Sequence, residues 1–443
     1  MPPIVSIVIP ICNVEGYLRG CLDCAVEQTL RDIEIICVDD GSTDGSAAIV
    51  DEYAARDPRV LAIHQPNAGA GAARNRGMAL ARGKYLYFPD ADDRFSVQLL
   101  EKAVSAAEAH LADVVVFRMR RIDELNDGEA RSEFRFRKAV TGLPQVFSWR
   151  DCPDVILDSF RTSVWNKLYR ASFVRAQKLT FQEIVRSNDL LFAELSLVSA
   201  SRIFLLDEVL YDYLIRTTGS LQATYAETPM TFVEAWRELK AELEGRGIFK
   251  AVRPGFVSYF WADSLKMLEN ASSHEIFARV YSELKGGIFA AFGIGPEDAE
   301  CMKSERKRLA FEILWTSGQD EFHVRYLKAM AQMREKLADA NSRRKTEIAQ
   351  LKETRDRCKA EIVQLKETRT RYKAEIAQLK EERRNLKESN RSLKEANLGL
   401  KEDRRILKSR IKELERRPHS IRGCAKFIFR RLRERVFGRR SEC

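Results

Sequence analysis

The sequence predicts an α/β fold with a mostly parallel sheet and helices on both faces, followed by a helical region and a long parallel coiled coil. Three observations lead to this prediction. Short apolar runs alternate with helical periodicity over the first hundred residues or so. Helical spacing of apolar residues continues through 226–330, and a heptad pattern fills most of the remaining chain.

The first elements form a strand–helix–strand unit. Strands are expected at Val5–Pro10 and Glu34–Val38, because each is an apolar run closed by a turn signal. Apolar residues recur at helical spacing between them, which predicts a crossover helix and a buried parallel sheet. The pattern then repeats, with a helix through Ile49–Tyr53, a strand at Val60–Ile63, a helix over Ala72–Ala81 and a strand at Lys84–Phe88.

The chain has 443 residues, which is too long for one compact core. Charged residues make up 32% of it and concentrate after about Met330, where glycine nearly vanishes. We therefore expect the globular part to end near that residue. The predicted divisions are two halves of an α/β domain at 1–115 and 116–225, a helical accessory region at 226–330, a coiled coil at 331–417 and a basic tail at 418–443.

The coiled coil is predicted from a seven-residue spacing that begins at Leu351 and ends at Leu414. These residues occupy the d position, and the a positions alternate between isoleucine and polar residues before becoming mostly polar. Glutamates at g face lysines at the following e, as in Glu347 and Lys352, which favours a parallel homodimer. A single solvated helix is the alternative.

The formal net charge of +10 comes mainly from the end of the chain. The last 28 residues hold ten Lys or Arg and two Glu. An apolar stripe with three phenylalanines runs through this basic tail, which is typical of a helix on an anionic membrane surface. A solvated basic tail is the alternative. DNA binding is not expected, because the basic residues follow the zipper and Pro418 interrupts the helix.

Nine scattered cysteines indicate a reducing compartment. Cys21 and Cys24 are interpreted as two thiols one helical turn apart, since no second pair or nearby histidine supports a metal site. No stretch approaches the ~20 apolar residues that a spanning helix needs. We expect a cytoplasmic protein, at most peripheral at the inner face of the cytoplasmic membrane.

Acidic residues follow two of the predicted strands. Asp39 and Asp40 end one strand, and Asp90, Asp92 and Asp93 follow another. Ligands of such sheets bind beyond the carboxyl ends of the strands. Clustered carboxylates repel one another, so a divalent cation bridging a diphosphate would account for them. Structural alternatives are a solvated turn for the second group and helix capping near the first.

The segment 67–77 combines small residues with Arg74 and Asn75 at a predicted helix start. Small residues permit close backbone approach, and Arg74 is a candidate partner for an anionic ligand. Tight packing of a Gly/Ala helix on the sheet is the alternative. The first strand is followed by neither a dinucleotide-binding glycine motif nor a P-loop.

Taken together, the motifs of residues 1–225 resemble those of glycosyltransferase family 2. The matching segments are V-S-I-V-I-P-I-C-N-V-E-G-Y-L at 5–18, V-D-D-G-S-T-D-G-S at 38–46, G-A-G-A-A-R-N-R-G at 69–77 and D-A-D-D at 90–93. Later segments also match: V-W-N-K-L-Y-R at 164–170, N-D-L-L-F at 188–192 and D-E-V-L-Y-D-Y-L-I-R at 207–216.

The resemblance implies a GT-A fold and inverting transfer of a hexosyl or N-acetylhexosaminyl group. The donor would be a nucleotide-diphosphate sugar of uridine type, and the acceptor a glycan or lipid-linked hydroxyl in cell-surface polysaccharide biosynthesis. The implied residues are Asp189 as catalytic base; Pro10, Cys12, Asp39, Asp40, Arg74, Asn75 and Asp90 for the donor; Asp92 and Asp93 for Mn²⁺ or Mg²⁺; and Trp165, Lys167 and Arg216 on the acceptor side.

The chain departs from the family pattern at three positions. Asn188 stands where an acid is usual, Cys12 where an aromatic is frequent, and Leu214 where relatives commonly carry arginine. Two other functions are therefore kept open. One is a nucleotidyltransferase, although the Gly-rich, Lys-bearing loop typical of that class is missing after the first strand. The other is a catalytically impaired transferase-like domain on a coiled-coil scaffold.

Overall fold

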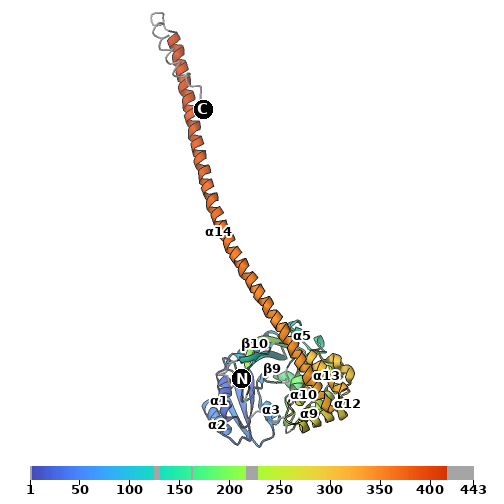
Figure 1. The fold of residues 1–443 in the computed structure, drawn as a ribbon. Coiled ribbons are helices and arrows are strands. Elements are labelled where there is room, and N and C mark those ends of the chain that lie inside the picture. Colours follow the sequence, from blue (N-terminus) through green and yellow to red (C-terminus); the bar gives the residue numbers. More distant parts are fainter. Residues whose placement is uncertain are drawn as a thin grey trace. The chain divides into compact units, whose positions relative to one another are not determined.

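The structure is a computed structural model that describes residues 2–123, 130–134, 136, 138–160, 163–215 and 228–416 (Figure 1). The chain divides into two compact units, Met1–Glu335 and Lys336–Cys443. Two sets of residues singled out by the sequence, Arg216 and the tail 418–443, lie outside the described residues.

The first half of the sheet is parallel, as the repeated strand–helix pattern predicts. Strands lie in the order β3-β2-β1-β4. The chain adds β2 and β3 on one side of β1 and then β4 on its other side, so the strand order reverses at β1. The strands are β1 (Val5–Ile11), β2 (Ile33–Asp40), β3 (Val60–Gln65) and β4 (Tyr85–Tyr87), joined by helices α1 (Glu15–Val26), α2 (Ser46–Arg56) and α3 (Ala70–Leu80).

The second half of the sheet is mixed. Strand β9 pairs antiparallel with both β4 and β6, whereas β10 pairs parallel with β6. Crossover helices join the parallel strands of the first half, whereas the last helix before the antiparallel β9, Ile156–Ser159, has only four residues. The α/β fold class is confirmed, with a mixed sheet. The remaining strands are β5 (Arg94–Phe95), β6 (Val114–Asp123), β7 (Ala130–Glu133), β8 (Val146–Phe147), β9 (Lys167–Arg170) and β10 (Ile203–Ile215).

Helices cover both faces of the sheet, because successive side chains of its buried strands point to opposite sides. On β2, Ile35 and Cys37 join the core beneath α1, α2 and α4, whereas Ile36 and Val38 join the core beneath α3 and α8. The helices of this half not yet given are α4 (Leu99–Ala109), α5 (Lys138–Thr141), η1 (Trp149–Asp151), α6 (Ile156–Ser159), α7 (Ala171–Ala176) and α8 (Leu190–Ser199).

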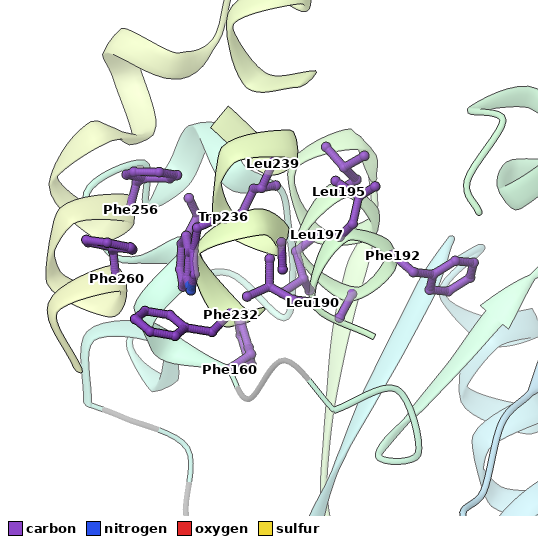
Figure 2. Packing of buried hydrophobic residues seen from close by; sticks show 14 of the residues in the cluster. Phe160, Leu190, Phe192, Leu195, Leu197, Phe232, Trp236, Leu239, Phe256 and Phe260 are labelled. Atoms are coloured by element: carbon purple, nitrogen blue, oxygen red, sulfur yellow. The ribbon is translucent and has the colours of Figure 1, made fainter. Parts of the chain in front are cut away.

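Helix α8 lies between the sheet and the helical region. Nine of its ten residues are buried, so it has no solvent-facing polar side. Phe192 points to the sheet side, where it stacks on Phe181 at 4.2 Å, whereas Leu190 and Leu197 face the helical region (Figure 2). Trp236 forms the centre of the opposing layer, with its ring 5.0 Å from that of Phe256. One continuous core therefore spans both parts.

The helices predicted for 226–330 are present. They are α9 (Thr231–Gly245), α10 (Phe249–Glu269), α11 (His274–Glu283), η3 (Leu284–Ile288), α12 (Phe289–Phe292), η4 (Pro296–Cys301), α13 (Glu305–Thr316) and the start of α14 (Gln319–Glu415). Phe322 and Tyr326 on α14 are buried among these helices. Among the described residues, none of the helices combines the length and apolarity needed to cross a lipid bilayer.

Candidate functional site

The acidic residues singled out by the sequence gather at the carboxyl edge of the parallel strands. Asp39 and Asp40 are the last residues of β2, and Asp90, Asp92 and Asp93 lie in the loop after β4. Strand β1 lies between these two strands, so the order reversal next to β1 places both groups at one crevice.

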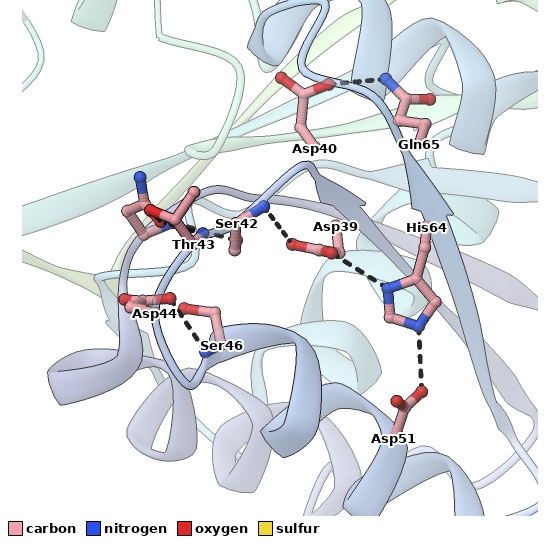
Figure 3. A network of polar contacts seen from close by, with 10 residues as sticks. Asp39, Asp40, Ser42, Thr43, Asp44, Ser46, Asp51, His64 and Gln65 are labelled. Atoms are coloured by element: carbon pink, nitrogen blue, oxygen red, sulfur yellow. Dashed lines mark hydrogen bonds and ion pairs between the residues drawn. The ribbon is translucent and has the colours of Figure 1, made fainter.

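Asp40 is buried and holds the loop that precedes α3. Its Oδ1 accepts a hydrogen bond from Gln65 Nε2 at 2.7 Å (Figure 3). Oδ1 also accepts from the Ala68 N–H at 2.9 Å, and Oδ2 accepts from the Gly69 N–H at 2.8 Å. Gly69 has a φ of 92°, which favours glycine at this helix start. Asp40 thus shapes the small-residue loop beside the crevice.

Asp39 is held by a histidine. His64 Nδ1 lies 3.0 Å from Asp39 Oδ2, and His64 Nε2 lies 3.0 Å from Asp51 Oδ1 (Figure 3). The other Asp39 oxygen accepts a hydrogen bond from the Ser42 N–H at 3.1 Å. The contacts with Asp39 and then with Asp51 raise the pKa of His64. A protonated imidazole would donate to both carboxylates, and the raised pKa favours that form.

A hollow of about 500 Å³ opens beside the loop that Asp40 holds. Its lining includes Asn67, Asn75, Arg76 and Glu183. Asn67 also donates from Nδ2 to Cys12 Sγ at 3.3 Å, which places the exposed Cys12 near this edge. Pro10 is half-buried near the end of β1. Of the predicted donor positions, Asn75 lines this hollow, and Asp40 and Cys12 contact residues of its lining.

Arg74 joins the two halves of the domain. Its buried guanidinium donates from Nη1 to Asn188 Oδ1 at 2.8 Å and from Nη2 to Asp90 Oδ1 at 2.6 Å. The guanidinium also lies over the Phe181 ring, 5.5 Å from its centroid. Asn188, one of the departures from the family pattern, thus supplies a neutral oxygen to Arg74. The motifs at 69–77, 90–93 and 188–192 therefore meet at the guanidinium of Arg74.

Asp189 is the N-cap residue of α8, with no capping hydrogen bond from its side chain. Burial raises the pKa of Asp189 to about 6, with the positive charge of Arg74 opposing this shift and the charge of Asp90 adding to it. Such a carboxyl is ionised at neutral pH yet remains a better proton acceptor than an ordinary aspartate. Asp189 is half-buried at the start of α8, and the alternative that its charge only favours the helix dipole stays open.

Asp90, Asp92 and Asp93 bring carboxylate oxygens within 4.8 Å of one another. Asp92 is half-buried. Burial, followed by the charges of Asp92 and Asp90, raises the pKa of Asp93 well above its usual value. A divalent cation would offset this repulsion, and hard oxygen ligands of this kind suit Mg²⁺ or Mn²⁺. The cluster therefore fits the cation that the sequence predicts.

Tyr211 on β10 positions the acidic loop and was not singled out from the sequence. Its hydroxyl donates to Asp93 Oδ2 at 2.7 Å and accepts from the Asp90 N–H at 3.2 Å. The Leu214 N–H donates to Asp93 Oδ1 at 2.7 Å. Asp93 is thus bound by protein donors on both oxygens. The only sequence signal for Tyr211 is its place in the motif at 207–216. His64 and Gln65, which bind Asp39 and Asp40, were also not singled out, and their only signal is their position at the end of a strand.

The two described acceptor-side candidates are buried. Trp165 stacks on Tyr211 with ring centroids 4.4 Å apart, so it packs against the residue that holds the acidic loop. Lys167 donates from Nζ to the Ser163 carbonyl at 2.6 Å, and its charge lowers the pKa of Asp189. Direct acceptor contact by either residue stays a prediction.

Asn75 fixes the segment that carries Asn188 and Asp189. Its side chain exchanges two hydrogen bonds with the backbone of Phe181, each 2.9 Å long. The same segment approaches α3 so closely that a Cβ added at Gly71 would lie 1.9 Å from the Gln182 carbonyl oxygen. Gly71 is therefore required for packing against this segment. Gly77 fits the alternative of tight packing on the sheet, because a Cβ there would lie 2.4 Å from Val8 Cγ1.

We expect Gly71→Ala to reduce transferase activity at least about tenfold, because the segment bearing Asp189 must move and overpacking costs about 1–3 kcal/mol. Steady-state kinetics and thermal unfolding measure the two effects. Gly16→Ala is the matched control, since an added Cβ there meets nothing within 4 Å. Equal kinetics for both variants would contradict the proposed link between this contact and the site.

The chain is similar to known glycosyltransferases. A family model described as glycosyl transferase family 2 matches residues 6–163. An uncharacterized glycosyltransferase of Bacillus subtilis, EpsJ, is 34% identical over 214 residues, covering 48% of this chain and 61% of the relative. Glycosyltransferase GlyG of Streptococcus pneumoniae is 32% identical over 234 residues, covering 51% of this chain and 74% of the relative.

The fold is also found among solved structures. Staphylococcus aureus TarS 1–349 in complex with UDP-GlcNAc superposes with a TM-score of 0.57 at 20% identity, covering 75% of this chain and 92% of that one. This likeness confirms the expected GT-A-type fold. The chain spans 61% and 63% of the first two curated relatives, so the match ends short of their full lengths. On the family model and the extent of the match to GlyG, the chain belongs to glycosyltransferase family 2.

Proposed function

We propose that this transferase moves a hexosyl or N-acetylhexosaminyl group, with inversion, from a UDP-sugar to a hydroxyl of a cell-surface glycan or lipid-linked acceptor. One observation carries the proposal. Arg74 contacts Asp90 of the acidic loop and Asn188 beside Asp189. The acidic loop, which is suited to bind a metal and diphosphate, and the segment carrying the proposed base therefore meet at one guanidinium.

The donor is assigned to the crevice formed by the half 1–115. Asp39 and Asp40 would contact the base and ribose, with Pro10, Cys12 and Asn75 nearby. A uridine donor is supported by the likeness to TarS, whose structure was solved in complex with UDP-GlcNAc. A hexosyl or N-acetylhexosaminyl group is supported by analogy, because the relatives include a poly(ribitol-phosphate) beta-glucosyltransferase and a beta-N-acetylglucosaminyltransferase.

The cation site is assigned to Asp92 and Asp93, with Asp90 beside them. A bound Mg²⁺ or Mn²⁺ would neutralise charge that builds on the departing diphosphate. Arg74 adds a fixed positive charge at Asp90, and Tyr211 holds the loop in place. These protein groups are already oriented, so little reorganisation is needed when charge develops.

Asp189 is assigned as the general base. It would remove the proton of the acceptor hydroxyl as the hydroxyl oxygen forms a bond to the anomeric carbon. The bond between that carbon and the diphosphate oxygen breaks, and UDP leaves with the electron pair. Attack from the side opposite the leaving group inverts the configuration.

The acceptor side is assigned to the half 116–225, including Trp165, Lys167 and Arg216. A cell-surface polymer is supported by the relative TarS, a poly(ribitol-phosphate) beta-N-acetylglucosaminyltransferase that is 25% identical over 262 residues. We also propose that the protein is cytoplasmic and that its tail, 418–443, contacts an anionic membrane surface. The tail and Arg216 lie outside the described residues, so their roles are predictions from sequence.

Calorimetric titration of the full chain with UDP and with GDP, in Mn²⁺ and in chelator, tests the donor assignment. We expect UDP to bind in Mn²⁺ at least about tenfold more tightly than in chelator, because the cation bridges diphosphate and carboxylates. GDP should bind more weakly. Absence of binding by either nucleotide would favour the catalytically impaired scaffold over the enzyme.

A further inference from the structure

The second compact unit exposes a regular apolar stripe. Within residues 336–416 no side chain is buried. Leu351 and Leu365 are both 68% exposed, and the a-position residues Ile348, Ile362 and Ile376 are 51–52% exposed. The d positions are Leu351, Cys358, Leu365, Tyr372, Leu379, Leu386, Leu393, Leu400, Leu407 and Leu414. A helix of this length with its apolar seam in water lacks the packing that stabilises helices in proteins.

We infer that this seam binds the same seam of a second copy of the chain, forming a parallel, in-register, two-stranded coiled coil over residues 348–414. The stripe repeats every seven residues without a break over ten consecutive d positions, as a left-handed coiled coil requires. A second copy is the partner whose seam has the same length and the same sequence of layers.

Charge selects the parallel orientation. Every e position from Lys352 to Lys408 is lysine. In an antiparallel pair these positions would face one another and place lysine against lysine along the whole interface. In a parallel pair each e lysine faces a g position of the other copy. Five of those positions are acidic: Glu347, Glu361, Glu375, Glu382 and Asp403.

The polar a positions select the register. Isoleucine and arginine alternate at a through the 14-residue repeat, from Ile348 and Arg355 to Ile376 and Arg383. A shift by one heptad would place isoleucine opposite arginine in every such layer. A shift by two heptads would bring Ile376 against Asn390 and leave two heptads without a partner. The unshifted alignment alone keeps each layer uniform.

Cys358 reports this alignment. It is an exposed free thiol at a d position, so an in-register parallel pair brings it opposite Cys358 of the second copy. Oxidised glutathione would convert the two thiols to one disulfide and release two reduced glutathione molecules. Peptide mass spectrometry of the full chain should identify a Cys358–Cys358 link. The control Cys358→Ser with Ala360→Cys moves the thiol to f, away from the seam, and should give at least about tenfold less of the equivalent link.

A charge swap tests the partner. One full-length variant carries K352E/K366E/K380E/K387E and a second carries E347K/E361K/E375K/E382K. Each alone should dimerise at least about tenfold more weakly than wild type, because its g and e charges repel, and mixing them should restore a mixed dimer. The matched control E353K/E367K/E381K/E388K changes four f positions and should dimerise like wild type.

Sedimentation equilibrium across a concentration series measures these masses. Dimers of wild type and control, weakened single variants and a restored mixture support the inference. A wild-type mass of one chain at all concentrations overturns it, as does a mass of three or four chains. A dimer without the Cys358–Cys358 link under oxidation overturns the parallel, in-register alignment.

Discussion

Asp92→Asn is expected to lower kcat/KM for sugar transfer by about a thousandfold or more. The substitution removes one negative charge from the cluster of Asp90, Asp92 and Asp93, whose oxygens lie within 4.8 Å. A cation held less tightly stabilises less of the charge on the departing diphosphate, and a thousandfold loss corresponds to about 4 kcal/mol of transition-state stabilisation. UDP release with a sugar donor and acceptor measures the rate.

The matched control is Asp207→Asn, because Asp207 is an exposed acid whose ion pair with Arg118 lies at the surface. Its kinetics should remain within about twofold of wild type. Metal-dependent UDP binding should also weaken in Asp92→Asn and stay unchanged in the control. Wild-type turnover by Asp92→Asn would exclude this residue from the cation site.

Asp189→Asn should reduce kcat by about a thousandfold while leaving UDP affinity nearly unchanged. The amide cannot accept the hydroxyl proton, whereas the donor contacts lie on the other side of Arg74. In wild type the pKa of Asp189 is raised to about 6, so kcat should fall as pH decreases through that value because the base becomes protonated. This acid limb should disappear from the residual activity of the variant.

The raised pKa also predicts the sign of a stability change. A carboxyl whose pKa is higher in the folded than in the unfolded protein favours folding at low pH and loses that contribution as pH rises through about 6. Asp189→Asn should therefore raise the melting temperature at pH 7.5 more than at pH 4.5. Wild-type kcat in Asp189→Asn would rule out the base assignment, whatever the melting curves show.

The sequence predicts the first half of the sheet because strand–helix units have a fixed local period and one connection geometry. Asp40 and Asp90 fall at the correct edge for the same reason, since parallel strands bring their carboxyl ends together. The antiparallel strand β9 was not predicted, because its pairing with β4 and β6 joins segments far apart in the sequence, where no local pattern specifies the contact.

Side-chain partners across long separations were also beyond sequence reasoning. Asn188 was singled out as a missing acid, yet its role as the partner of Arg74 depends on a contact between residues 114 positions apart. Tyr211 and Asp93 lie 118 positions apart. The helical region likewise gave no chemical signal, because its contribution is the packing of Trp236 and its neighbours against α8.

The contact of Arg74 with both Asp90 and Asn188 has a consequence for modular exchange among family members. Grafting a foreign acceptor-side segment onto this donor half would bring its own residue to position 188. An apolar residue there would leave a buried guanidinium without the oxygen that now binds it, a loss that costs more than an ordinary surface contact. Chimeras of this fold are therefore constrained at one position that touches neither sugar nor nucleotide in the assignment made above.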